Sequence, residues 1–155
     1  MPQKTLYMEN TQIAPDKTAR EISDLLLTFK ARQISMEYLP PNGKLIGLRF
    51  VLAIAEGELE FKLPVRIEPV YQVLMGRRKG LQNEADKRRV RLQAERVAWR
   101  QLFRWCQAQL ALIDTGMVAP QEVFLPYALQ PGAEQTMYES FEREWRKQLT
   151  AGGAK

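Results

Sequence analysis

The sequence predicts an α+β domain: a three-stranded antiparallel meander after an N-terminal helix, followed by a long central helix and a C-terminal helix. Two observations carry this prediction. Apolar and polar residues alternate over residues 34–38 and 59–63, as in half-buried strands, and a more apolar segment, 45–54, lies between them. Apolar residues instead recur at helical spacing over residues 19–29 and 83–113.

The N-terminal helix is expected to follow Pro15 and to end between residues 30 and 33. Thr18 and Glu21 have the spacing of a capping box, with Asp16 as a competing cap just upstream. Turn-forming residues at 40–43 and 56–58 separate the three strands, so the strands pair as a meander with one apolar and one partly polar face.

Three further helices are predicted after the sheet. A short helix begins at Glu68-Pro69, because proline is tolerated in the first turn. The long helix runs from about Asn83 to Ile113 and stops near Gly116 as a glycine cap. Thr136 and Glu139 have capping-box spacing before the final helix.

We expect one domain over residues 16–150, with a helix–sheet–helix part (16–75) and a helical part (83–150). Residues 1–15 are predicted to form an N-terminal arm and residues 151–155 a disordered tail. No apolar run is long enough to span a bilayer, and the N-terminus lacks the apolar stretch of a signal peptide. We therefore expect a cytoplasmic protein with no membrane partner.

Positive charge is concentrated in residues 76–104. This segment carries ten lysines and arginines against three acids, a net +7, in a chain whose total is +5. Such a concentration favours an anionic partner, and nucleic acid is the first hypothesis, with DNA preferred over RNA and single or double strands both open. The predicted phosphate contacts are Arg77, Arg78, Lys79, Arg89, Arg96, Arg100 and Arg104. A solvated helix face, or a site for a small anion, would explain the same charges.

Two apolar stripes run along the long helix. Trp99 and Phe103 lie on the second stripe, between Leu92 and Leu110, and are predicted either to stack on bases, to contact a partner, or to belong to the core. If this stripe meets a partner, the protein is an interaction module that binds a host or phage protein, or a homo-oligomer.

Enzymatic chemistry has little support in the composition. The chain has no histidine and a single cysteine, Cys106, which removes catalytic triads and the common zinc sites. We therefore expect a non-enzymatic protein with no cofactor and no metal. Glu60-Phe61-Lys62 matches the E-x-K element of the PD-(D/E)xK nucleases, with Glu21 as a helical acid, but the preceding strand has no carboxylate for Mg²⁺. The element order also resembles double-stranded RNA-binding domains, without their lysine-rich motif.

Several short segments, spread over most of the chain, resemble small uncharacterised proteins of bacteriophages and integrated mobile elements. The segments are 17–19, 37–38, 61–64, 95–100, 108–111, Gly116 and 124–127. The resemblance implies an accessory protein used in replication, recombination or host interaction, and it assigns no chemistry.

Overall fold

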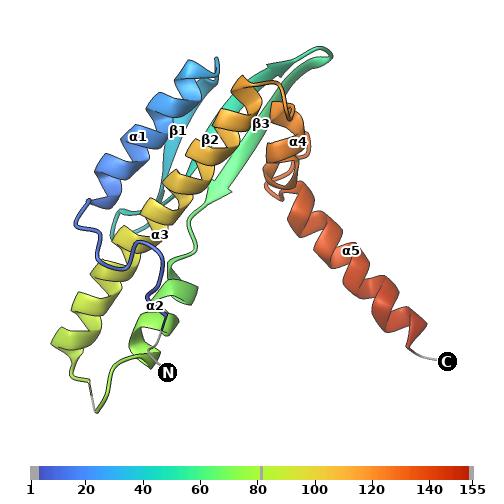
Figure 1. Cartoon of the computed structure of the whole chain (residues 1–155). Helices are drawn as coiled ribbons and strands as arrows, with labels where there is room; N and C mark the ends of the chain where they lie inside the picture. Colours follow the sequence, from blue (N-terminus) through green and yellow to red (C-terminus); the bar gives the residue numbers. More distant parts are fainter. Residues whose placement is uncertain (1–3, 81, 154–155) are drawn as a thin grey trace.

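The structure, a computed structural model, describes residues 4–80 and 82–153. The elements are α1 (Pro15–Thr28), β1 (Arg32–Leu39), β2 (Lys44–Ile54), β3 (Gly57–Pro64), α2 (Ile67–Gly76), α3 (Glu84–Asp114), α4 (Pro120–Phe124), the 3₁₀ helix η1 (Leu125–Tyr127) and α5 (Met137–Gly152). The predicted α+β class and element order are confirmed. Figure 1 shows α1 and α3 lying along the sheet, with α2 and the first half of α3 extending beyond it and α5 projecting on the other side.

The sheet has one apolar and one charged face. Its strands pair antiparallel in the order β1-β2-β3, which sets Phe50 opposite Phe61 and Leu48 opposite Leu63. These four side chains are fully buried in the cluster that also contains Trp99 of α3. Arg49, which alternates with them along β2, lies among carboxylates on the other face.

The start of α1 differs from the prediction. The helix begins at Pro15, with Ala14 as an extended cap residue that makes no side-chain hydrogen bond. Proline presets the helical φ angle and has no amide to satisfy, so it fixes the start one turn before the predicted cap. Thr18 is fully buried inside the helix, where its amide donates to the carbonyl of Ala14.

The ends of α3 follow local capping chemistry. The Asn83 side chain accepts a hydrogen bond of 2.8 Å from the amide of Asp86, which satisfies one of the free amides of the first turn. At the other end Gly116 has a φ of +75°, and the amides of Gly116 and Met117 donate to the carbonyls of Ile113 and Leu112. This is a Schellman motif, so the predicted glycine cap is confirmed.

Two apolar clusters lie along α3. The larger one joins α1, the sheet and the second half of α3. The smaller one lies beyond the sheet, where Leu74 of α2 packs with Val90 and Ala94 of α3 and with Leu6 of the N-terminal segment. The described part of the predicted arm is therefore tied to the domain, while residues 1–3 lie outside the described residues.

The C-terminal part leaves the core by way of α4 and η1. The Phe124 ring packs edge-to-face against that of Phe50, with 5.2 Å between ring centroids, and the amide of Leu129 donates to the carbonyl of Glu60 on β3. The predicted capping box opens α5, with Thr136 and Glu139 bonding each other's amides at 3.0 and 3.2 Å.

The last helix contains no buried residue and continues through Gly152. The predicted tail is therefore helical at residues 151–152, and residues 154–155 lie outside the described residues. Over the described ranges, no helix has the length and apolar character needed to cross a membrane.

Candidate nucleic-acid interface

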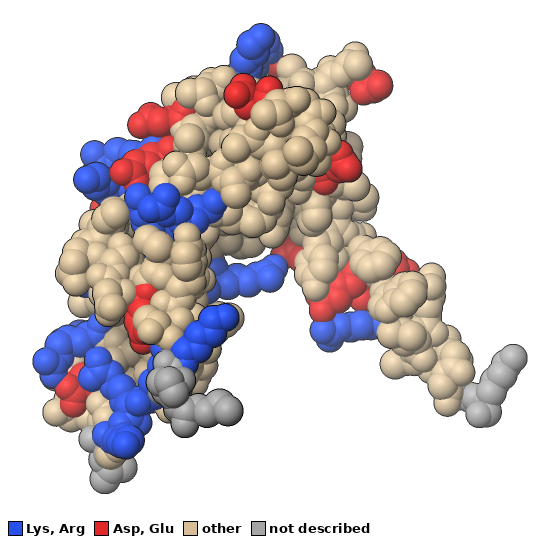
Figure 2. Space-filling model, viewed as in Figure 1, with Lys and Arg blue, Asp and Glu red and all other residues tan. Residues whose placement is uncertain are grey.

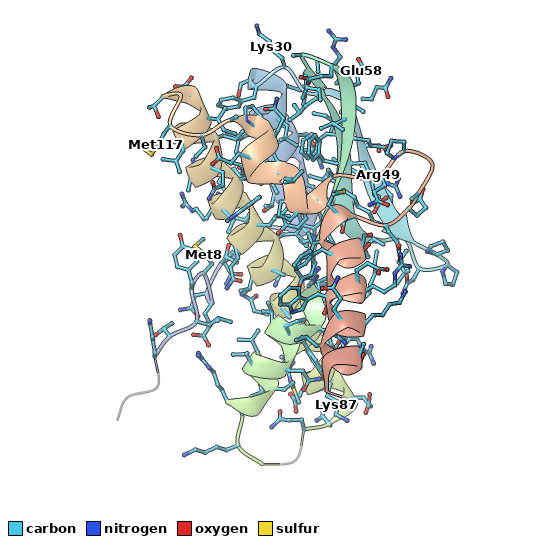
Figure 3. The ribbon with its side chains drawn as sticks, turned by 90° about the vertical axis from the view of Figure 1, so that its right-hand side faces the viewer. Met8, Lys30, Arg49, Glu58, Lys87 and Met117 are labelled. Atoms are coloured by element: carbon cyan, nitrogen blue, oxygen red, sulfur yellow. The ribbon has the colours of Figure 1, made fainter. Side chains whose placement is uncertain are left out.

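The predicted cationic loop joins α2 to α3 at the end of the molecule that lies beyond the sheet. We call this region the basic end and define it by Arg77, Arg78, Lys79, Lys87, Arg88, Arg89 and Arg91. Figure 2 shows blue side chains gathered there, and Figure 3 places Lys87 at the end opposite Lys30 and Glu58. Seven of the ten lysines and arginines of residues 76–104 thus lie in one protruding region.

Four cations of the basic end have carboxylate partners. The pairs are Arg77–Glu9, Lys87–Glu84, Arg89–Asp86 and Arg91–Glu68. Among the described residues, no carboxylate lies within 4.0 Å of Arg78, Lys79 or Arg88, and all three side chains are exposed. The basic end therefore keeps a local surplus of three positive charges after its ion pairs are counted.

Arg91 has a structural role at this end. Its guanidinium lies 4.0 Å from the centre of the Tyr71 ring and 3.0 Å from the carboxylate of Glu68. Hydrogen bonds from Gln72 and then from Arg91 hold the pKa of Glu68 below its ordinary value. Arg91 thus joins α3 to α2, and we do not count it among the cations that are free to meet an anion.

The N-terminal segment braces the basic end. Arg77 pairs with Glu9 at 3.0 Å and donates to the carbonyl of Lys4 at 2.7 Å. Gln93 of α3 donates to the carbonyls of Glu9 and Thr11 at 2.8 and 2.9 Å. Arg77, a predicted phosphate contact, is therefore already engaged in holding the segment against α2 and α3.

The predicted arginine stripe on α3 is not a continuous open row. Arg100 is 8% exposed, pairs with Glu21 of α1 and lies over the ring of Phe103, at 4.2 Å from its centre. The prediction that Arg100 lies on an open, phosphate-binding face is wrong, because packing of α1 against α3 encloses its guanidinium. A carboxylate from a distant segment supplies its counter-charge.

The other members of the stripe remain accessible but are spread out. Arg89 is exposed beside Asp86 at the start of α3. Arg96 is half-buried and donates to Gln93, the side chain that holds the N-terminal segment. Arg104 is exposed and donates to Gln107. Only Arg89 of this stripe belongs to the basic end.

Trp99 and Phe103 are core residues. Trp99 is 0% exposed and Phe103 is 8% exposed, and both belong to the cluster between α1, α3 and the sheet. Stacking on a base or contact with a partner needs an accessible ring face, so the structure removes both side chains from the candidate interface. Leu110 is likewise buried, whereas Leu92 is exposed. The second stripe of the long helix is thus used within the chain.

The residues of the nuclease alternative are not brought together. Glu21 lies at the α1–α3 contact with Arg100, whereas Glu60 lies on the charged face of the sheet, 3.6 Å from Arg49. Arg49 also pairs with Glu37 and Glu134, and its hydrogen bond lowers the pKa of Glu134. Among the described residues no group of three or more potential ligands is arranged to hold a metal ion.

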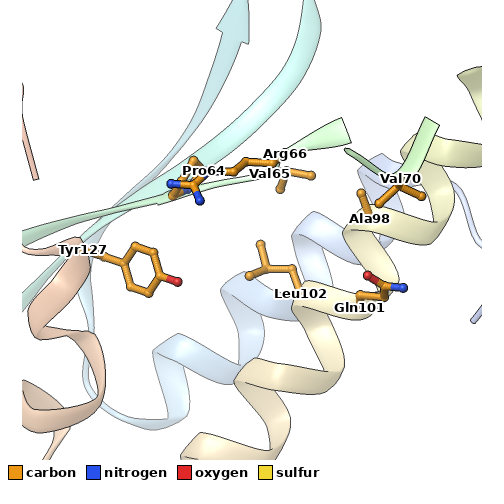
Figure 4. Close-up of a pocket in the computed structure, with 8 residues that line it drawn as sticks. All are labelled: Pro64, Val65, Arg66, Val70, Ala98, Gln101, Leu102 and Tyr127. Atoms are coloured by element: carbon orange, nitrogen blue, oxygen red, sulfur yellow. The ribbon is translucent and has the colours of Figure 1, made fainter. Parts of the chain in front are cut away.

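A pocket of about 200 Å³ lies where β3, α2, α3 and η1 meet (Figure 4). Val70 and Leu102 form part of its apolar wall, and Arg66, Gln101 and Tyr127 supply polar groups. Its volume is below the roughly 300–1,000 Å³ of typical small-molecule sites. We therefore do not place the function there.

Cys106 is also unsuited to chemistry. It is fully buried, and burial raises the pKa of its thiol to about 12. The reactive thiolate is therefore suppressed near neutral pH.

Arg88 is an exposed cation of the basic end that is absent from the predicted phosphate contacts. The helical contacts are predicted from their angular position relative to the apolar stripes, which does not select Arg88. The run Lys87-Arg88-Arg89 directly after the N-cap region was the available signal. No protein-family model, curated protein or solved structure matches the chain.

Proposed function

We propose that this chain is a non-enzymatic accessory protein that binds nucleic acid through its basic end. The observation that carries the proposal is the set of three exposed cations, Arg78, Lys79 and Arg88, that protrude without an acidic partner among the described residues. Mobile counterions balance such charges in solution, and a polyphosphate backbone releases those ions on binding. The resemblance to phage and mobile-element proteins supports a context of replication, recombination or host interaction.

Recognition should depend on the phosphate backbone and only weakly on base sequence. Trp99 and Phe103, the two side chains predicted to stack on bases, are buried. Arginine and lysine contacts to phosphates position a nucleic acid but carry little sequence information. We therefore expect similar affinities for unrelated sequences of the same length and strandedness.

The test is a salt titration of binding to labelled single- and double-stranded DNA and RNA, with a variant that removes the three unpaired cations (Arg78→Ala, Lys79→Ala and Arg88→Ala). For a duplex, the slope of log affinity against log salt should become shallower by about 2.7, because each lost phosphate contact removes about 0.9. Arg77 is left in place, since its removal would also release Glu9 and the N-terminal segment.

A charge-matched control variant distinguishes binding at the basic end from a general effect of the positive charge of the protein. Lys17, Arg20 and Arg104 are exposed, and the described residues hold no carboxylate within 4.0 Å of them. Replacing these three with alanine changes the net charge by the same amount. Equal losses in the two variants, or an unchanged slope in the first, would refute the basic end as the binding surface.

A further inference from the structure

The last helix exposes an apolar face that the described residues do not cover. Tyr138, Phe141, Trp145 and Leu149 line one side of α5, and we call them the α5 stripe. Phe141 is 61% exposed and Trp145 is 51% exposed, and their rings stack with 5.7 Å between centroids. Figure 1 shows α5 projecting away from the sheet and from α3.

The patch is comparable in size to the largest apolar patch of a typical monomer, and such patches are often functional. A buried aromatic side chain covers roughly 150–250 Å², so three half-exposed aromatic residues leave about 300 Å² open. Leu149 and Leu125, which are also exposed, bring the patch to roughly 400 Å². A shallow apolar groove between Leu125, Pro126 and Met137 continues the stripe at its N-terminal end. The stripe and the groove together form one contiguous apolar surface, which is the kind of surface that a partner can cover.

The charges of α5 are self-complementary. Its first half carries Glu139, Glu142 and Glu144 against Arg143, and its second half carries Arg146 and Lys147. The two halves therefore have opposite net charge, and each half carries the sign that compensates the dipole of the helix itself. A second copy of the same helix, laid antiparallel, sets the acidic half of each against the basic half of the other.

The flank of the stripe fits this arrangement residue by residue. At 100° per residue, Glu142 and Arg146 lie on the same side of the stripe, and they pair with each other within the helix. A two-fold axis across antiparallel helices brings each flank against its own copy with the direction reversed. Glu142 and Arg146 are centred on position 144 of the chain. The stripe, from Tyr138 to Leu149, is centred between positions 143 and 144. A two-fold axis near this position therefore places Glu142 of each copy opposite Arg146 of the other. It also brings the Phe141–Trp145 pair of one copy against the same pair of the other.

We propose that α5 is a homodimerisation helix that binds α5 of a second copy of this chain in antiparallel orientation. The apolar surface per copy is roughly 400 Å², whereas each partner of a standard interface buries about 800 Å² of polar and apolar surface together. The dimer should therefore be weak and concentration-dependent, in the micromolar range. This proposal does not depend on nucleic-acid binding.

Sedimentation velocity of the full chain over a micromolar concentration series is the first test. The wild type should pass from monomer to dimer as concentration rises. The variant Phe141→Ser/Trp145→Ser should stay monomeric with an unchanged core, because α5 contains no buried residue. Thermal unfolding followed by circular dichroism checks the core, and Thr150→Ala, an uncharged position of α5 away from the stripe, is the control that should still dimerise.

Charge reversal tests the orientation. Glu142→Arg and Arg146→Glu should each weaken self-association, because each places like charges opposite one another across the two-fold axis. An equimolar mixture of the two variants should form a heterodimer, since opposite charges then meet between the chains. The pair within each helix is still broken in that mixture, so recovery cannot come from restored helicity.

Three results would overturn the proposal. They are a wild type that stays monomeric across the series, a dimer that survives Phe141→Ser/Trp145→Ser, and a mixture of the charge variants that associates no better than either alone. If the wild type stays monomeric and α5 instead binds a different protein, the proposal is overturned as well.

Discussion

Replacing Glu21 by glutamine should destabilise the protein much more than replacing its partner Arg100 by methionine. The side chain of Arg100 is 9% exposed and pairs with Glu21, while its Nε atom has no hydrogen-bond partner among the described residues. Glu21→Gln leaves this cation enclosed between α1 and α3 without its counter-ion. Arg100→Met removes the cation and keeps an apolar chain of similar length over the ring of Phe103.

The magnitudes follow from the enclosure of the pair. Removing one partner of a fully buried pair costs roughly 3–5 kcal/mol. Because the Glu21 side chain is 32% exposed, water reaches part of the site, and we expect Glu21→Gln to lower the free energy of unfolding by about 2–3 kcal/mol. For a chain of this size that corresponds to a Tm lower by about 5–10 °C. Arg100→Met should cost under about 1 kcal/mol.

Urea unfolding of the two single variants and the double variant measures both effects. In the Arg100→Met background the glutamine substitution should cost almost nothing, so the coupling between the sites should be about 2 kcal/mol. Arg100→Met should also leave the salt slope of nucleic-acid binding unchanged, because the enclosed guanidinium does not reach a phosphate. A larger cost for Arg100→Met than for Glu21→Gln, or a shallower salt slope, would refute the assignment of Arg100 to the core.

Two further substitutions test the sheet and the buried thiol. Gly47→Ala should lower the free energy of unfolding in urea by more than about 2 kcal/mol, because an added Cβ would lie 2.6 Å from the backbone oxygen of Leu63. The control is Gly76→Ala, where an added Cβ has no atom within 4 Å among those described, and it should be neutral or slightly stabilising. Burial raises the pKa of the Cys106 thiol to about 12, whereas the thiol of the unfolded chain has a pKa near 8.5. The contribution of Cys106 to the free energy of unfolding is therefore fully present below pH 8.5 and is lost as the pH rises above it. The stability advantage of the wild type over Cys106→Ala should therefore shrink by about 2 kcal/mol between pH 8 and pH 10, and an unchanged difference would contradict the raised pKa.

Local chemistry explains why most of the fold could be predicted. Asn83, Gly116 and Thr136 mark helix ends through hydrogen bonds to backbone groups within a few residues, so the sequence contains all the partners. The alternation of apolar and polar residues that predicts each strand is likewise contained within a few neighbouring residues. Thr18 failed as a predicted cap because two start signals compete there, and Pro15 is the one that the backbone follows.

The candidate site could not be predicted in the same way, because its decisive partners are distant in sequence. Glu21 meets Arg100 across 79 positions, and Glu9 meets Arg77 across 68. A helical wheel shows that two apolar stripes run along α3, but it does not show what covers each one. In the structure α2 covers Val90 and Ala94, while α1 and the sheet cover Trp99, so most of both stripes is buried within one chain, although Leu92 stays exposed.

The two surfaces left over are separated in the structure, and this separation determines how they can act together. The basic end protrudes beyond the sheet on α2 and α3, and the α5 stripe projects on the other side of the fold. Substitutions at such distant, exposed sites should be additive in stability. If both proposals hold, a dimer presents two basic ends to one nucleic acid, and the second contact becomes intramolecular. Phe141→Ser/Trp145→Ser should then weaken binding to long polynucleotides and leave binding to oligonucleotides that fill one basic end unchanged. Equal effects on both lengths would mean that α5 contacts the nucleic acid directly.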